Sequence, residues 1–140
     1  MKFKADGYNW IVRLEKGEKL IESLTRLVKQ ENIPSCWINA IGAVTFAELG
    51  FYDLDNKEYQ WHKVNELMEI TGLQGNIAFD GDEPVFHVHG TFSKRDMNII
   101  GGHVKELTIG GTCEILLHRW YKDNFTRTKS DEIGLNLLDL

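Results

Sequence analysis

The stretch GEKLIESLTRLVKQEN, residues 17–32, decides the fold that we expect for this chain. Its apolar residues recur at the spacing of an α-helix and form one stripe with charged residues opposite; they are Leu20, Ile21, Leu24, Leu27 and Val28. We therefore predict one main helix over about residues 17–31. A helix with a single apolar stripe must bury that stripe against another element of the fold.

The rest of the chain predicts the surface on which this helix packs. Apolar or alternating segments, punctuated by Gly, Asn and Asp, are typical of β-strands; they cover residues 8–14, 35–53, 58–79, 84–93, 98–104 and 111–120. Thirteen glycines against two prolines suit tight turns and close backbone approaches. We predict an α+β fold, a mostly antiparallel β-sheet with one packed helix, in a single domain over residues 1–140.

Length and composition indicate an ordinary globular protein. A chain of 140 residues, 42% hydrophobic and 26% charged, can bury a core that is stable without disulfides or bound metals. Its N-terminus lacks an apolar run of signal-peptide length, and no stretch approaches the ~18 apolar residues of a membrane helix. Cys36 and Cys113 each lie in an apolar stretch, as buried reduced thiols do. We expect a soluble protein of the cytoplasm, without a membrane partner.

The charge balance argues against general nucleic-acid binding. The chain has 16 Lys and Arg against 21 Asp and Glu, a net charge of −5, whereas duplex DNA is bound largely by cations that neutralise phosphates. The densest basic stretches are Lys94-Arg95 and the segment from Lys122 to Lys129, which Asp123 dilutes. We interpret both as solvated surface, so DNA is a possible but disfavoured partner.

The segment PVFHVHGTFS, residues 84–93, contains the first candidate for chemistry. His87 and His89 are two residues apart, so on a strand they project from the same face with Cα atoms about 7 Å apart. Neutral imidazole is the commonest metal ligand in proteins. The spacing by itself is a weak signal, because such pairs also occur on strands that bind nothing.

A third histidine strengthens this hypothesis. The following residues, GTFSKRDMNIIGGH, predict the rest of a β-hairpin whose turn lies around residues 94–98. A register that pairs His103 with either His87 or His89 gathers three imidazoles on one face. Three histidines with an open fourth position are a known ligand set for zinc, so we predict a site for zinc or another divalent transition metal.

Two alternatives to this site stay open. An odd register would put His103 on the other face, although Gly101 and Gly102 could carry a bulge that shifts the register by one residue and re-aims the side chain. Alternatively, the glycines belong to turns and the histidine is merely hydrogen-bonded. His62 and His118 stand alone in the sequence and are not expected to be ligands.

Two glutamates in strand-like segments could support such a site. Glu69 lies in an otherwise apolar segment, where a buried carboxylate needs a hydrogen bond or a cation. It either supports a histidine or pairs with Arg13 or a lysine at a sheet edge. Glu114 shares an ordinary alternating face with Leu116 and His118, so we assign it no catalytic role.

Several segments in order resemble the plants-and-prokaryotes conserved (PPC) domain family over nearly the whole chain. They are LEKGEKLIESL (14–24), INAIGAVTFAELGFYD (38–53), MEITGLQGNI (68–77), PVFHVHGTFSKRDMNIIGGHV (84–104) and TCEILL (112–117). The most specific parts are similar to the family's Glu-containing strand ahead of a Ser/Thr-x-x-Gly turn, here Glu69 to Gly75, and to its His-x-His followed by Gly-Gly-His, here His87, His89, Gly101, Gly102 and His103.

The resemblance implies a compact α+β domain that assembles as a homotrimer, with the three histidines available for a metal such as zinc. It also implies Glu69, Gly101 and Gly102 as supporting residues. Plant members of the family carry an AT-hook for A·T-rich DNA, and this sequence has none.

Three functions follow as hypotheses. The first is a stand-alone, oligomeric metal-binding module that is either non-enzymatic or has no assigned reaction. The second is a DNA-binding regulator. The third is a metal-dependent hydrolase or lyase acting on a small molecule, which needs a cleft beside the histidines and a base within about 3 Å of a metal-bound water.

Overall fold

The structure is a computed structural model that describes residues 1–120 and 124–140. Within these residues the chain forms one helix, α1 (Leu20–Glu31), and a series of strands. The strands are β1 (Lys2–Ala5), β2 (Asn9–Glu15), β3 (Cys36–Asp53), β4 (Glu58–Val64), β5 (Met68–Asp80), β6 (Glu83–Ser93), β7 (Ile99–Arg119), β8 (Arg127–Lys129) and β9 (Asn136–Leu138). The predicted α+β class, a mostly antiparallel sheet with one helix, is confirmed.

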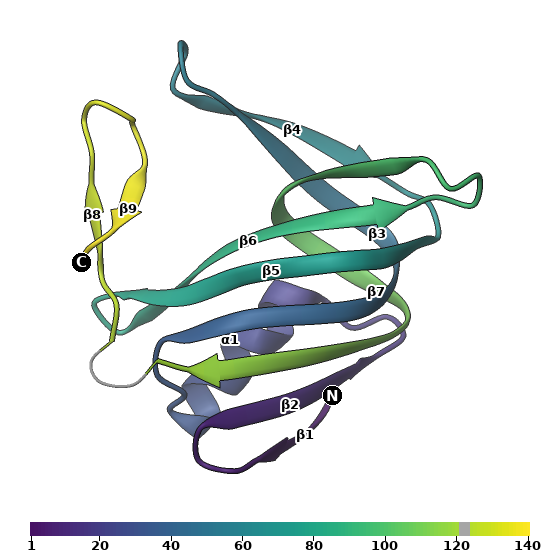
Figure 1. Ribbon diagram of the computed structural model, residues 1–140, viewed down its shortest axis with the longest axis horizontal. Helices are drawn as coiled ribbons and strands as arrows, with labels where there is room; N and C mark the ends of the chain where they lie inside the picture. Colours follow the sequence, from purple (N-terminus) through teal and green to yellow (C-terminus); the bar gives the residue numbers. More distant parts are fainter. Residues whose placement is uncertain (121–123) are drawn as a thin grey trace.

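Seven strands form one antiparallel sheet in the order β1-β2-β7-β6-β5-β3-β4 (Figure 1). The long strand β7 pairs with β6 over its first residues and with β2 farther along, and it also pairs with β3. Because β3 pairs in turn with β5, and β5 with β6, the hydrogen-bonded neighbours β3, β5, β6 and β7 form a closed circuit. The sheet is therefore strongly curved rather than flat.

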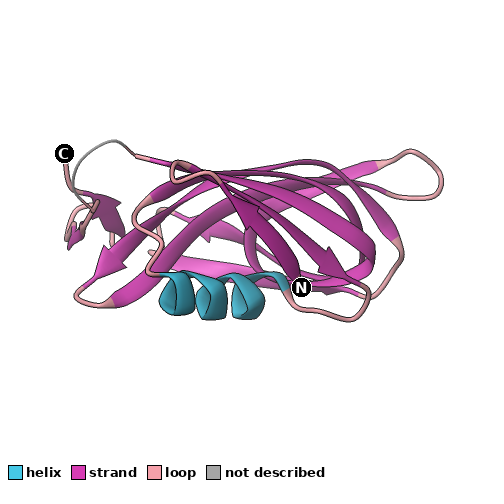
Figure 2. Cartoon of the chain, turned by 90° about the horizontal axis from the view of Figure 1, so that it is seen from below, coloured by secondary structure: helices cyan, strands magenta, loops and turns pink. Residues whose placement is uncertain are grey.

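Helix α1 packs across one face of this sheet, as its apolar stripe predicts (Figure 2). Leu20, Leu24 and Leu27 are fully buried among inward-facing side chains of the strands. The glutamate Glu106 of β7 accepts hydrogen bonds from the backbone N–H groups of Ile21 and Glu22, at 2.9 and 3.2 Å. Those groups have no partner inside the helix, so this carboxylate caps it from the sheet.

The helix begins three residues later than predicted, at Leu20 instead of residue 17. Gly17 has a left-handed φ of 87° and donates a backbone hydrogen bond to Ile109 at 2.8 Å. The carbonyl of Glu18 accepts one from Ile109 in return, at 2.9 Å. Pairing with β7 thus keeps residues 17–19 out of the helix, which local helical spacing cannot reveal.

The C-terminal residues form a second, two-stranded sheet, the β8–β9 hairpin, which lies beside β5 in Figure 1. The backbone N–H of Phe79 in β5 donates to Phe125 at 2.8 Å and fixes the start of this hairpin. The hydroxyl of Tyr52 in β3 donates to the carbonyl of Ile133 at 2.8 Å and fixes its loop. The hairpin is therefore attached to the main sheet at two points, near the ends of β5 and β3.

The two cysteines are free and buried, as predicted. Burial raises the pKa of Cys36 and that of Cys113 to about 12, so both thiols stay protonated at neutral pH. Among the described residues, the one helix is too short to span a membrane.

Candidate metal centre

The three histidines lie on the outer face of the sheet, away from α1. Side chains alternate along a strand, and Val88 of β6 and Val104 of β7 point into the core. His87, His89 and His103 therefore point outward. His103 pairs directly with His89, which is one of the two registers that bring the three rings together.

The turn of this hairpin is where the sequence predicts it. The backbone N–H of Lys94 donates to Asn98, and that of Met97 donates to Lys94, both at 2.9 Å. The pairing from His89–His103 to Ser93–Ile99 runs without a shift, so no bulge forms at the two glycines.

The imidazole rings form a nearly equilateral triangle. Their centroids are 5.1 Å apart for His87 and His89, and 5.4 Å apart for each of these rings and His103. One nitrogen from each ring lies within 4.8 Å of the others. The Nε2 atoms of His87 and His89 are 3.3 Å apart. Two nitrogens on a tetrahedral zinc with bonds of about 2.0–2.1 Å are about 3.3 Å apart, so the ring positions fit one ion.

His103 is the most enclosed of the three ligand candidates. Its ring packs against Tyr59 and Trp61 of β4, with centroids 5.0 and 6.0 Å away. Its Nδ1 atom is buried without a hydrogen-bond partner among the described residues. A buried polar atom without a partner needs a ligand or a water molecule, so the donor set fits a metal on this count too.

Electrostatics keep two of the rings neutral. Burial, followed by the neighbouring His87, His89 and Arg127, lowers the pKa of His103 to about 4. Burial, Arg127 and His89 also lower the pKa of His87. Neutral imidazole is the form that binds metals, so these rings need not lose a proton to a metal at neutral pH.

Gly101 and Gly102 permit close packing of β7 against its neighbouring strands. A Cβ on Gly102 would lie 2.8 Å from the carbonyl oxygen of Gly50 in β3, and one on Gly101 would lie 2.6 Å from that of Gly90 in β6. Both distances are too short for a real Cβ, so β7 can approach its neighbours only with glycine there.

The structure contradicts both predicted roles of Glu69. Its side chain is exposed, and it pairs with Ser93, four residues or about 13 Å along β6 from His89. Arg13 forms its ion pair with Glu15 instead, at 3.3 Å. The segment from Glu69 to Gly75 is also not a turn, because β5 runs through it with an irregularity after Ile70. The distance of Glu69 from the histidines follows from this register, which cannot be read from the local sequence.

A pocket of about 600 Å³ opens beside the histidines. It lies between β4, β5, β6 and the C-terminal hairpin, and among the described residues it is lined by Tyr59, Asn76, Val85, Phe86, His87, His103, Arg127, Gly134, Leu135, Asn136, Leu137 and Leu138.

The sequence by itself did not identify Arg127 as a residue of this pocket. We interpreted the Lys122 to Lys129 segment as solvated surface; Lys122 and Asp123 lie outside the described residues, and Arg127 is half-buried in this pocket. No local motif marks it.

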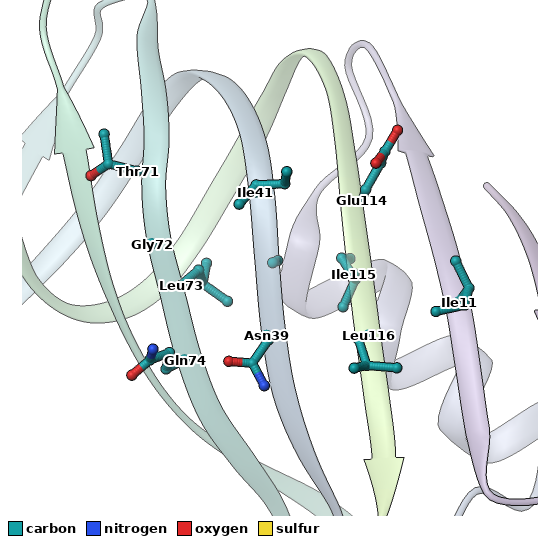
Figure 3. A pocket seen from close by; sticks show the side chains of 11 residues that line it. Ile11, Asn39, Ile41, Thr71, Gly72, Leu73, Gln74, Glu114, Ile115 and Leu116 are labelled. Atoms are coloured by element: carbon teal, nitrogen blue, oxygen red, sulfur yellow. The ribbon is translucent and has the colours of Figure 1, made fainter.

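A second hollow, of about 430 Å³, lies elsewhere on the outer face (Figure 3). It runs across β5, β3, β7 and β2, and its exposed apolar side chains include Ile11 and Ile41, which are 55% and 60% exposed. Gln74 lines this hollow and also a shallow one that includes His89. The second hollow therefore reaches the edge of the histidine cluster through the polar side chain of Gln74.

The remaining histidines are apart from this cluster, as predicted. His62 is exposed on β4, and His118 lies 2.7 Å from the side-chain oxygen of Asn9 through its Nδ1.

Together, the fold and the site define a class of protein, a small α+β domain with a three-histidine cluster on the outer face of a curved antiparallel sheet. The chain belongs to the Plants and Prokaryotes Conserved domain family, whose model matches residues 1–120. The family that the sequence resembles is thereby confirmed.

Three solved structures have the same fold over nearly the whole chain. A protein named for an inferred DNA-binding role, from Bacteroides thetaiotaomicron, is 29% identical, with 99% of this chain and 96% of that chain covered and a TM-score of 0.93. A metal-containing protein from Archaeoglobus fulgidus is 29% identical, with both chains covered fully and a TM-score of 0.89. A PPC protein from Pyrococcus horikoshii is 26% identical, with 99% and 95% covered and a TM-score of 0.88. The chain matches none of the curated proteins with which we compared it.

Proposed function

We propose that this PPC-domain protein is a self-associating metal-binding module, in which His87, His89 and His103 hold one divalent transition-metal ion, with zinc as the first candidate. The observation that carries the proposal is the triangle of imidazoles, whose two closest nitrogens are 3.3 Å apart, as on a tetrahedral ion. The Archaeoglobus relative, named as metal-containing, supports it.

The proposal assigns no reaction to the protein. A bound zinc would supply a Lewis acid with an open fourth position. A hydrolase or lyase also needs a base, and the described residues that line the adjacent pocket include no Asp or Glu. The cleft that the enzyme hypothesis requires is therefore present, while its carboxylate base is not among these residues.

The metal site is tested by elemental analysis of protein purified without an affinity tag. We expect close to one metal ion per wild-type chain, and at least a tenfold lower content in His89→Ala, because two imidazoles cannot complete the ligand set. His62→Ala, with its exposed histidine on β4, is the matched control and is expected to keep the wild-type content. Equally low metal in wild type and His89→Ala would refute the site.

We also propose that copies of the chain cover the apolar outer face of the sheet, in the homotrimer that the family resemblance implies. The face exposes Ile11 of β2 and Ile41 of β3, the two strands that pair with either side of β7, and it is opposite to the face that α1 covers. Exposed apolar side chains that gather in one hollow are typical of interaction surfaces. The position of this face beside His89 would bring a neighbouring copy close to the metal centre.

The assembly is tested by light scattering after size-exclusion chromatography. Wild-type protein is expected at about three times the chain mass of 16.1 kDa. Ile41→Asp is expected to shift the protein toward 16.1 kDa, because a carboxylate cannot be buried in an apolar contact without a partner. Phe51→Asp, also exposed on β3, should not dissociate it. A wild-type monomer would contradict the proposal.

Duplex DNA is not part of the proposal, although the Bacteroides relative is named for such a role. The chain carries a net charge of −5, and phosphate neutralisation requires an excess of cations on the binding face.

A further inference from the structure

We propose that the pocket beside the three histidines binds a small organic carboxylate, and that the guanidinium of Arg127 pairs with the carboxylate group. This inference rests on the proposed function in one respect, since a metal on the histidines would add a second positive charge to the same pocket. It names the class of ligand that the metal centre takes.

Arg127 is held in place at the pocket by two hydrogen bonds. One terminal nitrogen donates to the side-chain oxygen of Asn76 on β5 at 2.7 Å, and the other donates to the carbonyl of Asn136 on β9 at 3.0 Å. Asn76 is itself buried. Both acceptors are uncharged, so they orient the guanidinium and leave its positive charge uncompensated.

The remaining donors of this guanidinium have no partner among the described residues. A guanidinium offers five N–H groups, of which these two bonds use two. The Nε atom is buried without a hydrogen-bond partner, and the ion pairs between described residues do not include Arg127. A fixed, half-buried cation with free donors is a binding site for a planar oxyanion.

The charge of the pocket points to the same class of ligand. Its described lining contains one permanent cation, Arg127, and no carboxylate. In a chain with 21 Asp and Glu, this is a local positive site in an acidic protein. A divalent metal on the three histidines would add to that charge, and the described lining offers no carboxylate to compensate it, which favours an anionic ligand.

The other walls select an organic anion over an inorganic one. Val85 and Phe86 of β6 line the pocket together with Leu135, Leu137 and Leu138 of the C-terminal hairpin. A volume of about 600 Å³ is in the range of small-molecule sites, which combine apolar walls with a few polar groups that fix orientation. The geometry fits a carboxylate whose apolar substituent lies against these side chains.

The test is isothermal titration of metal-free and zinc-loaded protein with hexanoate, its neutral analogue hexanamide, and inorganic phosphate. Wild type is expected to bind hexanoate, and to bind hexanamide and phosphate at least tenfold more weakly. Arg127→Gln is expected to weaken hexanoate binding about tenfold to hundredfold, the size of one charge-assisted pair. Arg127→Lys, which keeps the charge without the planar fork, should fall between them.

Lys129→Gln is the matched control, because it removes one positive charge from the same strand, at an exposed position outside the pocket. It should bind hexanoate as wild type does. Zinc content and the thermal unfolding midpoint are measured for every variant, so that unfolding of the C-terminal hairpin in Arg127→Gln is recognised. If the hairpin unfolds in Arg127→Gln, the hexanoate affinity of Arg127→Lys is compared with that of wild type instead.

Each outcome has a separate meaning for the two proposals. Wild type that holds zinc but does not bind hexanoate, or binds it equally in Arg127→Gln, overturns the carboxylate site and leaves the metal site intact. Tighter binding of phosphate than of hexanoate overturns the choice of a carboxylate. Wild type without zinc overturns the proposed function, and the comparison of wild type with Arg127→Gln in metal-free protein still decides the role of Arg127.

Discussion

Gly75→Ala is expected to lower the free energy of unfolding by about 3 kcal/mol and to abolish metal binding. Gly75 lies in β5, and a Cβ there would be placed 2.1 Å from the backbone carbonyl oxygen of His87 and 2.8 Å from the Cα of Val88. Both obstacles are backbone atoms, which cannot rotate away as a flexible side chain can. Strand β6 must therefore move at the residue that holds the first ligand.

The effect is measured by urea unfolding together with elemental analysis. Gly111→Ala is the control, because a Cβ on Gly111 in β7 meets no atom within 4 Å. That variant should unfold within about 0.5 kcal/mol of wild type and keep its metal. Normal metal content in Gly75→Ala would show that the position of His87 does not depend on this close approach.

In metal-free protein, acidification from pH 7 to pH 5 is expected to lower the free energy of unfolding through His103 by about 1 kcal/mol. The folded pKa of His103 is about 4, against an ordinary value of 6.5. Between these values the unfolded chain binds more protons than the folded one, so stability falls as the pH falls. The contribution is complete above pH 6.5 and lost below pH 4; partial solvent screening reduces its size.

The measurement is urea unfolding of the metal-free protein at pH 7 and pH 5. His103→Gln should show a smaller loss on acidification, since that side chain takes up no proton. His62→Gln should keep the wild-type difference, because the replaced histidine is exposed on β4. The carboxylates whose pKa hydrogen bonds lower, such as Asp53 and Asp96, lose their contribution at lower pH than this window. An unchanged difference in His103→Gln would contradict the assignment.

Much of the fold and the core of the site follow from local patterns. The apolar stripe of residues 17–32 predicts a helix on a sheet, because burial of that stripe requires a second layer. The two-residue spacing of His87 and His89 puts them on one face of any strand, and the short turn after them limits where His103 can lie. Those features depend on the periodicity of side chains and on the length of the turn, and both can be read directly from the sequence.

The surroundings of the site depend on tertiary structure. Glu69 is 18 residues from His87 in sequence and in a strand that pairs with β6, yet its register places it about 13 Å along β6 from His89, on the same outer face. Arg127 reaches the pocket only because the closed circuit of strands brings the C-terminal hairpin beside β5. The start of α1 is likewise set by pairing with β7.

The amino-acid sequence by itself thus determined the two layers, the outward histidine pair and the short hairpin that returns the third ring. Only the folded sheet decided which charged groups surround those rings. Contacts between distant segments depend on strand register and sheet curvature, and the local periodicity of a sequence predicts neither of them.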